Sequence, residues 1–140
     1  MDYFMLFQQD QFLEEVMEET RRYAIQSGME SKLAFLTKSN LLCTMAVILL
    51  SGYHKLPYRN MYWEESVDTF SKVVSDNIRR DTFTLILKTV HFVNNEDLDN
   101  NDRFAKVRKI FDNLNKCSKK YLPIVKNKSI DEMMIFWPSL

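Results

Sequence analysis

The basic residues between Arg103 and Lys128 are the side chains whose type and spacing indicate a chemistry most directly. That stretch contains nine lysines and arginines and one acid, Asp112. Clustered cationic groups attract DNA phosphates and release counterions on binding. Solvated lysine-rich helix faces are also common, so charge alone leaves DNA contact and simple solvation both open. The candidate DNA-contacting lysines are Lys106, Lys109, Lys116, Lys119, Lys120, Lys126 and Lys128.

Three arginines outside this stretch are additional candidates for phosphate contact. Arg59 lies in an aromatic and basic loop, and Arg79 and Arg80 lie at a break between two predicted helices. Phosphate contacts give affinity, whereas preference for a DNA sequence requires contacts to base edges. The sequence assigns no such base contact.

The other end of the chain is acidic. Residues 1–30 carry seven acids against Arg21 and Arg22, so the formal net charge of zero conceals two opposite poles. Several of these acids fall in the first turns of a predicted helix, where they suit the helix dipole. We interpret this helix as a solvated outer helix. The alternative is that it forms a self-association surface.

No metal site is expected in the polar segment 94–102. Asp97, Asp99 and Asn101 alternate like the first ligands of a calcium-binding EF-hand loop. The glycine that such a loop needs is Asp102 here, and its bidentate glutamate is Arg108. We therefore expect a polar linker.

The histidines and cysteines form no recognisable catalytic arrangement. His54 and His91 have no Ser or Cys partner that the sequence supports. Cys43 and Cys117 form neither a CxxC pair nor a disulfide framework, which favours a reducing intracellular compartment. We expect no small-molecule substrate.

The composition predicts a mainly α protein, a helical bundle. Only 2 glycines and 3 prolines occur in 140 residues, too few for the many turns of a sandwich or barrel. With 46% hydrophobic residues, the chain has enough apolar side chains for a core.

The bundle is predicted to surround the apolar stretch Asn40–Leu50, which carries no charge. A helix that is apolar on all faces is expected to be buried on all faces. The stretch is much shorter than the roughly 20 residues that cross a bilayer, so no membrane contact is expected. We predict a central helix from Thr37 to Ser51, with Thr37 as its N-cap.

The remaining elements follow from apolar spacing and turn residues. Helices are predicted from Asp10 to just before Gly28, over 67–78, over 81–90 and over 103–121, with one strand at 129–137. The apolar residues that the helix over 103–121 is expected to bury are Phe104, Val107, Phe111 and Leu114.

Four separated groups of residues match the motifs of one known family. They are Ser51–Tyr53 with Pro57 and Met61–Trp63; Arg79–Phe83 with Thr89–Phe92 and Asn94–Asn95; Asp102–Arg108 with Asn113–Asn115 and Tyr121–Pro123; and Ser129–Glu132. Each motif is weak alone, and their order and spacing make the match specific. On these motifs the chain resembles the piggyBac-type transposases and the genes domesticated from them.

The resemblance implies a domain organisation and an ancestral activity. Residues 1–126 would be a helical dimerisation and DNA-binding domain, and residues 127–140 the truncated start of an RNase H-like catalytic domain. Asp131 stands in the place of the family's first catalytic aspartate. The family cuts and pastes DNA at TTAA targets with Mg²⁺ held by aspartates. A nuclear location and a homodimer are further implications.

The chain also departs from the family pattern. Ser139–Leu140 stand where Gly-Arg is usual, Thr82 stands where Arg is common, and the further catalytic aspartates are absent from the 140 residues. Two-metal cleavage needs several converging carboxylates. Glu132 cannot complete the site, because neighbouring side chains of a strand point to opposite faces. We expect no nuclease activity and no bound cofactor.

Two classes of function remain at this stage. The first is a transposase-derived DNA-binding module, a catalytically incomplete fragment of a cut-and-paste transposase. The alternative is a protein–protein interaction module that self-associates through the acidic helix or the aromatic loop, or a degenerate remnant without selected function. The loop aromatics, which could equally cover the central helix, are Tyr58, Met61, Tyr62 and Trp63.

Overall fold

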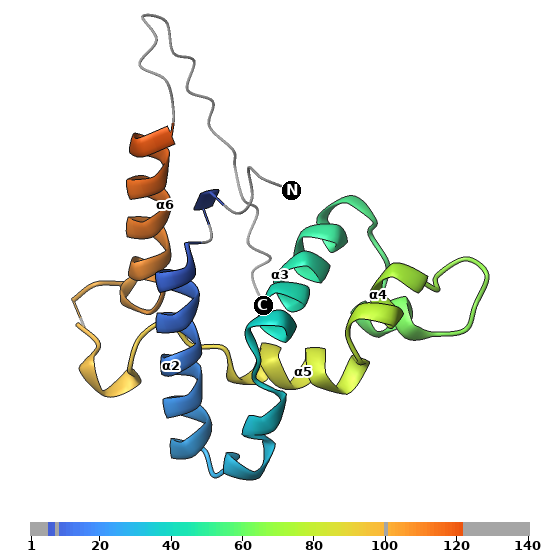
Figure 1. Cartoon of the computed structure of the whole chain (residues 1–140), viewed down its shortest axis with the longest axis horizontal. Helices are drawn as coiled ribbons and strands as arrows, with labels where there is room; N and C mark the ends of the chain where they lie inside the picture. Colours follow the sequence, from blue (N-terminus) through green and yellow to red (C-terminus); the bar gives the residue numbers. More distant parts are fainter. Residues whose placement is uncertain (1–5, 8, 100, 122–140) are drawn as a thin grey trace, which may run out of the picture.

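The computed structural model describes residues 6–7, 9–99 and 101–121, and within these ranges the chain is helical and contains no strand (Figure 1). The mainly α prediction is confirmed. The predicted strand at 129–137 and the predicted domain boundary after residue 126 lie outside the described residues. The α-helices and the 3₁₀-helices (η), in order, are α2 Asp10–Gln26, η1 Glu30–Phe35, α3 Lys38–Tyr53, η2 Arg59–Trp63, α4 Lys72–Asn77, α5 Arg80–Thr89, η3 Asn95–Asp97, η4 Ala105–Val107 and α6 Arg108–Tyr121.

Helix α2 ends where the sequence predicts, at a glycine that suits the turn. Gly28 has a φ of 68°, the left-handed region that closes many helices. The Gly28 amide donates to the Ile25 carbonyl at 3.0 Å, and the Met29 amide donates to the Ala24 carbonyl at 2.8 Å. These two bonds satisfy carbonyls at the end of the helix and turn the chain into η1.

Helix α3 confirms its predicted cap but not its predicted burial. The Thr37 hydroxyl accepts a hydrogen bond from the Asn40 amide at 3.1 Å, as an N-cap does. Among its apolar side chains, Ile48 is 46% exposed and Leu49 is 51% exposed, so the prediction of burial on all faces is wrong. Ile48 and Leu49 line an open groove between α2, α3 and α5, which the described residues leave unfilled.

Two apolar clusters form the core, and α3 and α5 contribute to both. The first cluster joins α2, α3 and α5, and its buried members are Phe12, Leu13, Val16, Met17, Leu41 and Ile86. The second cluster joins α3 and α5 to η2 and α4, and its buried members are Val47, Tyr62, Val74, Ile78 and Phe83.

The aromatic loop supplies the second cluster. Tyr62 is 1% exposed and donates a hydrogen bond to the His54 carbonyl. The indole N–H of Trp63 donates to the Ile78 carbonyl at 2.8 Å, and the ring lies 5.2 Å from that of Phe83. Tyr62 and Trp63 therefore cover the central helix, whereas Tyr58 is exposed.

The helix predicted over 67–78 begins later than expected. Helix α4 starts only at Lys72, and Val67 is fully exposed in the preceding turn. The Phe70 amide donates to the Ser66 carbonyl at 3.0 Å within that turn. The apolar spacing is helical, but only Val74 and Ile78 reach the core.

The burial predicted for the last helix is wrong. Phe104, Phe111 and Leu114 are exposed, and Val107 is only half-buried. The fully buried residue of α6 is Cys117, which was not among those expected to be buried. In the described part of the chain, α6 therefore carries apolar side chains that no neighbouring element covers, among them Phe111 and Leu114.

Candidate nucleic-acid interface

The lysines of α6 form an exposed basic surface at the end of the helix. Lys116, Lys119 and Lys120 are exposed and follow the three- and four-residue spacing that places side chains on neighbouring positions of a helix. Lys119 and Lys120 lie in the last turn, where positive charge suits the helix dipole. Their ammonium groups can reach solvent or a phosphate. Lys106, in η4, is exposed as well.

A neighbouring side of α6 contacts residues around the start of α2. The Cys117 side chain is 0% exposed, and the side-chain amide of Gln9 donates to its Sγ at 3.5 Å. The Asn113 side-chain amide donates to the Phe7 carbonyl at 2.9 Å. These contacts set the rotation of α6 and so determine which lysines face solvent.

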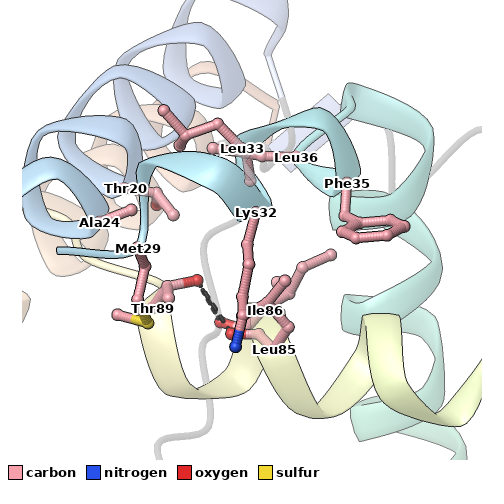
Figure 2. A pocket seen from close by; sticks show the side chains of 10 residues that line it. All are labelled: Thr20, Ala24, Met29, Lys32, Leu33, Phe35, Leu36, Leu85, Ile86 and Thr89. Atoms are coloured by element: carbon pink, nitrogen blue, oxygen red, sulfur yellow. Dashed lines mark hydrogen bonds between the residues drawn. The ribbon is translucent and has the colours of Figure 1, made fainter. Parts of the chain in front are cut away.

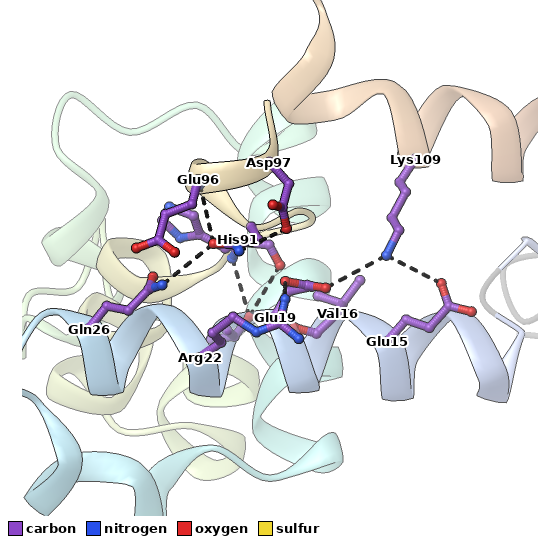
Figure 3. Close-up of polar contacts among 11 residues, drawn as sticks. Glu15, Val16, Glu19, Arg22, Gln26, His91, Glu96, Asp97 and Lys109 are labelled. Carbon is purple, nitrogen blue, oxygen red and sulfur yellow. Dashed lines mark hydrogen bonds and ion pairs between the residues drawn. The ribbon is translucent and has the colours of Figure 1, made fainter. Parts of the chain in front are cut away.

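Lys109 is half-exposed, with 42% of its side-chain surface accessible, and also faces two acids. Its Nζ lies 3.8 Å from Glu15 Oε2 and 3.9 Å from Glu19 Oε1, both on α2 (Figure 3). Glu19 also accepts a hydrogen bond from Arg22 at 2.8 Å. The acidic helix, expected to be a solvated outer helix, therefore uses two of its carboxylates against the basic helix.

The segment before α6 is closed by a second ion pair. Arg108 donates to both oxygens of Asp102, at 2.8 and 2.7 Å, and the Phe104 amide donates to Asp102 Oδ1 at 2.9 Å. The hydrogen bonds from Arg108 and then from Phe104 lower the pKa of Asp102, and the carboxylate in turn raises the pKa of Arg108. Asp102 and Arg108, the ends of one recognised motif, brace the turn that contains η4.

The candidate arginines lie in a different part of the molecule. Arg59 begins η2, and Arg79 and Arg80 stand at the start of α5; all three are exposed. The η2–α4–α5 corner lies on the side of the fold away from α6 (Figure 1). Arg80 Nε is 3.3 Å from Asp81 Oδ1. The candidates predicted as one set therefore separate into two groups.

Three predicted site residues are not among the residues that the structure describes. Lys126, Lys128 and Asp131 lie beyond Tyr121, where the described residues end.

A polar junction around His91 was not anticipated from the sequence. The His91 ring stacks on Tyr23 at 3.6 Å between centroids, and the His91 backbone N–H donates to the Thr20 hydroxyl at 3.2 Å. Nδ1 lies 3.0 Å from the Thr89 carbonyl, and Nε2 lies 3.2 Å from the Asn95 side-chain nitrogen. The motif residues His91 and Asn95 thus join the end of α5 to α2. Thr20, a polar residue on the apolar stripe of α2, was the sequence signal for this junction.

Two hollows of the described structure are lined mainly by apolar residues. One lies under η1, between α2 and α5, with a volume of about 10 Å³, and Thr89 in its wall donates to the Leu85 carbonyl (Figure 2). That volume is at the lower limit for one water molecule. A groove of about 240 Å³ between α2, α3 and α5 is lined by apolar residues and Thr44.

The described residues contain no group of three or more His, Cys, Asp or Glu side chains placed to hold a metal ion. None of the described helices combines the length and apolarity needed to traverse a lipid bilayer.

Comparisons with known proteins support the resemblance. The family model described as Transposase IS4 matches residues 1–139. The chain is 39% identical over 131 residues to the human PiggyBac transposable element-derived protein 2, covering 94% of the chain and 22% of that protein. It is 35% identical over 130 residues to the human PiggyBac transposable element-derived protein 3, covering 93% of the chain and 21% of that protein.

The match is therefore extensive for this chain and partial for its relatives. No solved structure matches significantly. The chain spans about a fifth of the length of these curated relatives. Because the family model covers nearly every residue, the chain belongs to the transposase family, among its piggyBac-type, transposable element-derived members.

Proposed function

We propose that this chain is a DNA-contacting helical module of its transposase-derived family, and that α6 makes the main phosphate contact in the nucleus. The observation that carries the proposal is the exposed surface of Lys116, Lys119 and Lys120 on a helix that is anchored through the buried Cys117. An anchored helix holds these ammonium groups at one edge of the fold, where a DNA backbone can approach.

The expected binding is electrostatic and tolerant of sequence. Each phosphate neutralised by a lysine releases counterions, so affinity falls steeply as salt rises. No described residue of α6 is assigned to a base edge. Arg59, Arg79 and Arg80 add a second contact on the other side of the fold, which a longer duplex would be needed to reach.

We also propose that the 140-residue chain binds DNA without cutting it. Two-metal cleavage needs several carboxylates around a pair of ions, and the resemblance supplies Asp131 alone. The chain is expected to leave plasmid DNA intact in Mg²⁺. Nicking that disappears in Asp131→Ala would show instead that the chain builds a working metal site.

The first test is fluorescence anisotropy of a labelled duplex containing TTAA, beside a shuffled duplex, at two salt concentrations. We expect micromolar binding at low salt that weakens steeply with salt for both duplexes. The double variant Lys119→Gln/Lys120→Gln should bind roughly five- to tenfold more weakly and lower the salt slope by up to about two.

A matched variant separates the α6 surface from overall charge. Lys32→Gln/Lys88→Gln removes two exposed lysines from η1 and α5 and should change binding much less. Equal losses in the two variants would contradict a contact centred on α6. Absence of binding at low salt, with a mass that rises with concentration, would favour the self-association alternative.

A further inference from the structure

Lys109 of α6 lies within ion-pair distance of Glu15 and Glu19 of α2. Resting on the proposed function, we infer that these two glutamates compete with DNA phosphate for Lys109 and so limit the phosphate-binding surface to the later lysines of α6. The positive charge of Lys109 is then partly offset by α2 and is less available to DNA.

The two carboxylates are held in place by other side chains of α2. Glu15 Oε1 accepts from the Gln11 side-chain amide at 3.3 Å, which leaves Oε2 toward Lys109. Glu19 Oε2 accepts from Arg22 at 2.8 Å, which leaves Oε1 toward Lys109. Each carboxylate thus presents one oxygen to the same ammonium group, across the gap between α2 and α6 (Figure 3).

A phosphate at Lys109 would meet both negative charges. Ions bound to the same ammonium group lie within roughly 7 Å of each other, inside the screening length of about 8 Å at physiological salt. The Glu19 side chain is only 13% exposed, so solvent screens it less than an exposed acid. The repulsion therefore opposes phosphate at Lys109.

The opposing charge is concentrated at one end of the basic surface. A polar groove between α2 and α6 contains Glu15, Lys109 and Lys116 in its wall. Lys119 and Lys120 lie further along α6 and form no ion pair with an acid in the described residues. The inferred binding surface accordingly lies toward the C-terminal end of α6.

The test is a double-mutant cycle on DNA affinity, measured by anisotropy with a fixed labelled duplex at low salt. Lys109→Gln in the native background should change the affinity less than about 1.5-fold, because its charge is already engaged. Glu15→Gln/Glu19→Gln should tighten binding roughly three- to fivefold, and adding Lys109→Gln to it should remove most of that gain.

The matched control is Glu14→Gln/Glu18→Gln, which makes the same charge change on the same helix. Both side chains are exposed, and neither forms an ion pair with α6 in the described residues. This control should tighten binding less than twofold. An equal gain in the control, or an equal effect of Lys109→Gln in both backgrounds, would overturn the inference and leave the proposed function standing.

Failure of the proposed function has a different signature. If the native chain and all variants, each shown to be folded by circular dichroism, fail to bind DNA at low salt, both the function and the inference built on it are overturned.

Discussion

Helix α2 is held by different forces on its two sides. Toward α3 and α5 it buries Phe12, Leu13 and Val16 in an apolar cluster. Toward α6 it offers Glu15 and Glu19 to Lys109, beside the buried Cys117 and the half-buried Ile110, which packs against the same apolar cluster. Burial of apolar area stabilises a fold much more than partly exposed ion pairs, each of which contributes about 0.2–1 kcal/mol.

This difference suggests that the helical body and α6 contribute differently to stability and to DNA contact. Because it holds both apolar clusters, we expect the α2–α3–α5 body to provide most of the stability. Helix α6 is attached by fewer buried groups and exposes its basic surface. Regions with few buried contacts open locally at lower free energy than the core. Three predictions test this comparison between the body and α6.

The largest effect is expected in the body, from Phe83→Ala. The side chain is 2% exposed and packs against Trp63. Its loss leaves a cavity in the second cluster and should lower the free energy of unfolding by about 3–5 kcal/mol. Urea denaturation followed by circular dichroism measures it. Val73→Ala, at a position 74% exposed on α4, is the control and should have little effect.

A loss below about 1 kcal/mol for Phe83→Ala would mean that the aromatic cluster can collapse around the gap. The body would then not be the stable half of the molecule.

An intermediate effect is expected at the attachment of α6, from Cys117→Ala. Removal of the buried Sγ also removes its contact with Gln9, and should cost about 1 kcal/mol. Amide hydrogen exchange should quicken across α6 while α5 changes little. Cys43→Ala, a half-buried cysteine of α3, is the matched control and should not quicken exchange in α6. Uniform quickening across both helices would show that α6 and the body open as one unit.

The smallest effect is expected at the turn before α6, from its ion pair. The pKa of Asp102 is lowered in the folded chain, so its contribution to stability is present above the ordinary carboxyl pKa of 3.8. It is lost as the pH falls through the lowered value, because the unfolded state binds the proton more readily. Asp102→Asn should therefore lower the thermal midpoint slightly at neutral pH and weaken its acid dependence.

The control for this exposed pair is Asp68→Asn, in the loop before α4. It should leave both the midpoint and its acid dependence nearly unchanged. Identical acid profiles for Asp102→Asn and the native chain would show that the Arg108 pair does not couple to folding.

Much of this architecture follows from local sequence signals. Helix caps and ends depend on neighbouring residues, so Thr37 and Gly28 predicted them. The sequence did not decide whether Tyr62 and Trp63 lie in the core or on the surface. The structure packs them with Val47 and Phe83 in the second cluster. The sequence identified the lysines of α6 as a basic cluster. It did not show that Lys109 pairs with acids of α2.

The sequence by itself determined the helical class, the positions of most helices, the basic character of the last described helix and the family motifs. These are local properties of composition, periodicity and residue order. Only the tertiary structure decided that α3 leaves Ile48 exposed, that Phe111 faces outward and that Lys109 is paired with α2. The physical reason is that a helix repeats its side chains every 3.6 residues whatever surrounds it, whereas burial and ion pairing depend on which neighbour covers which face.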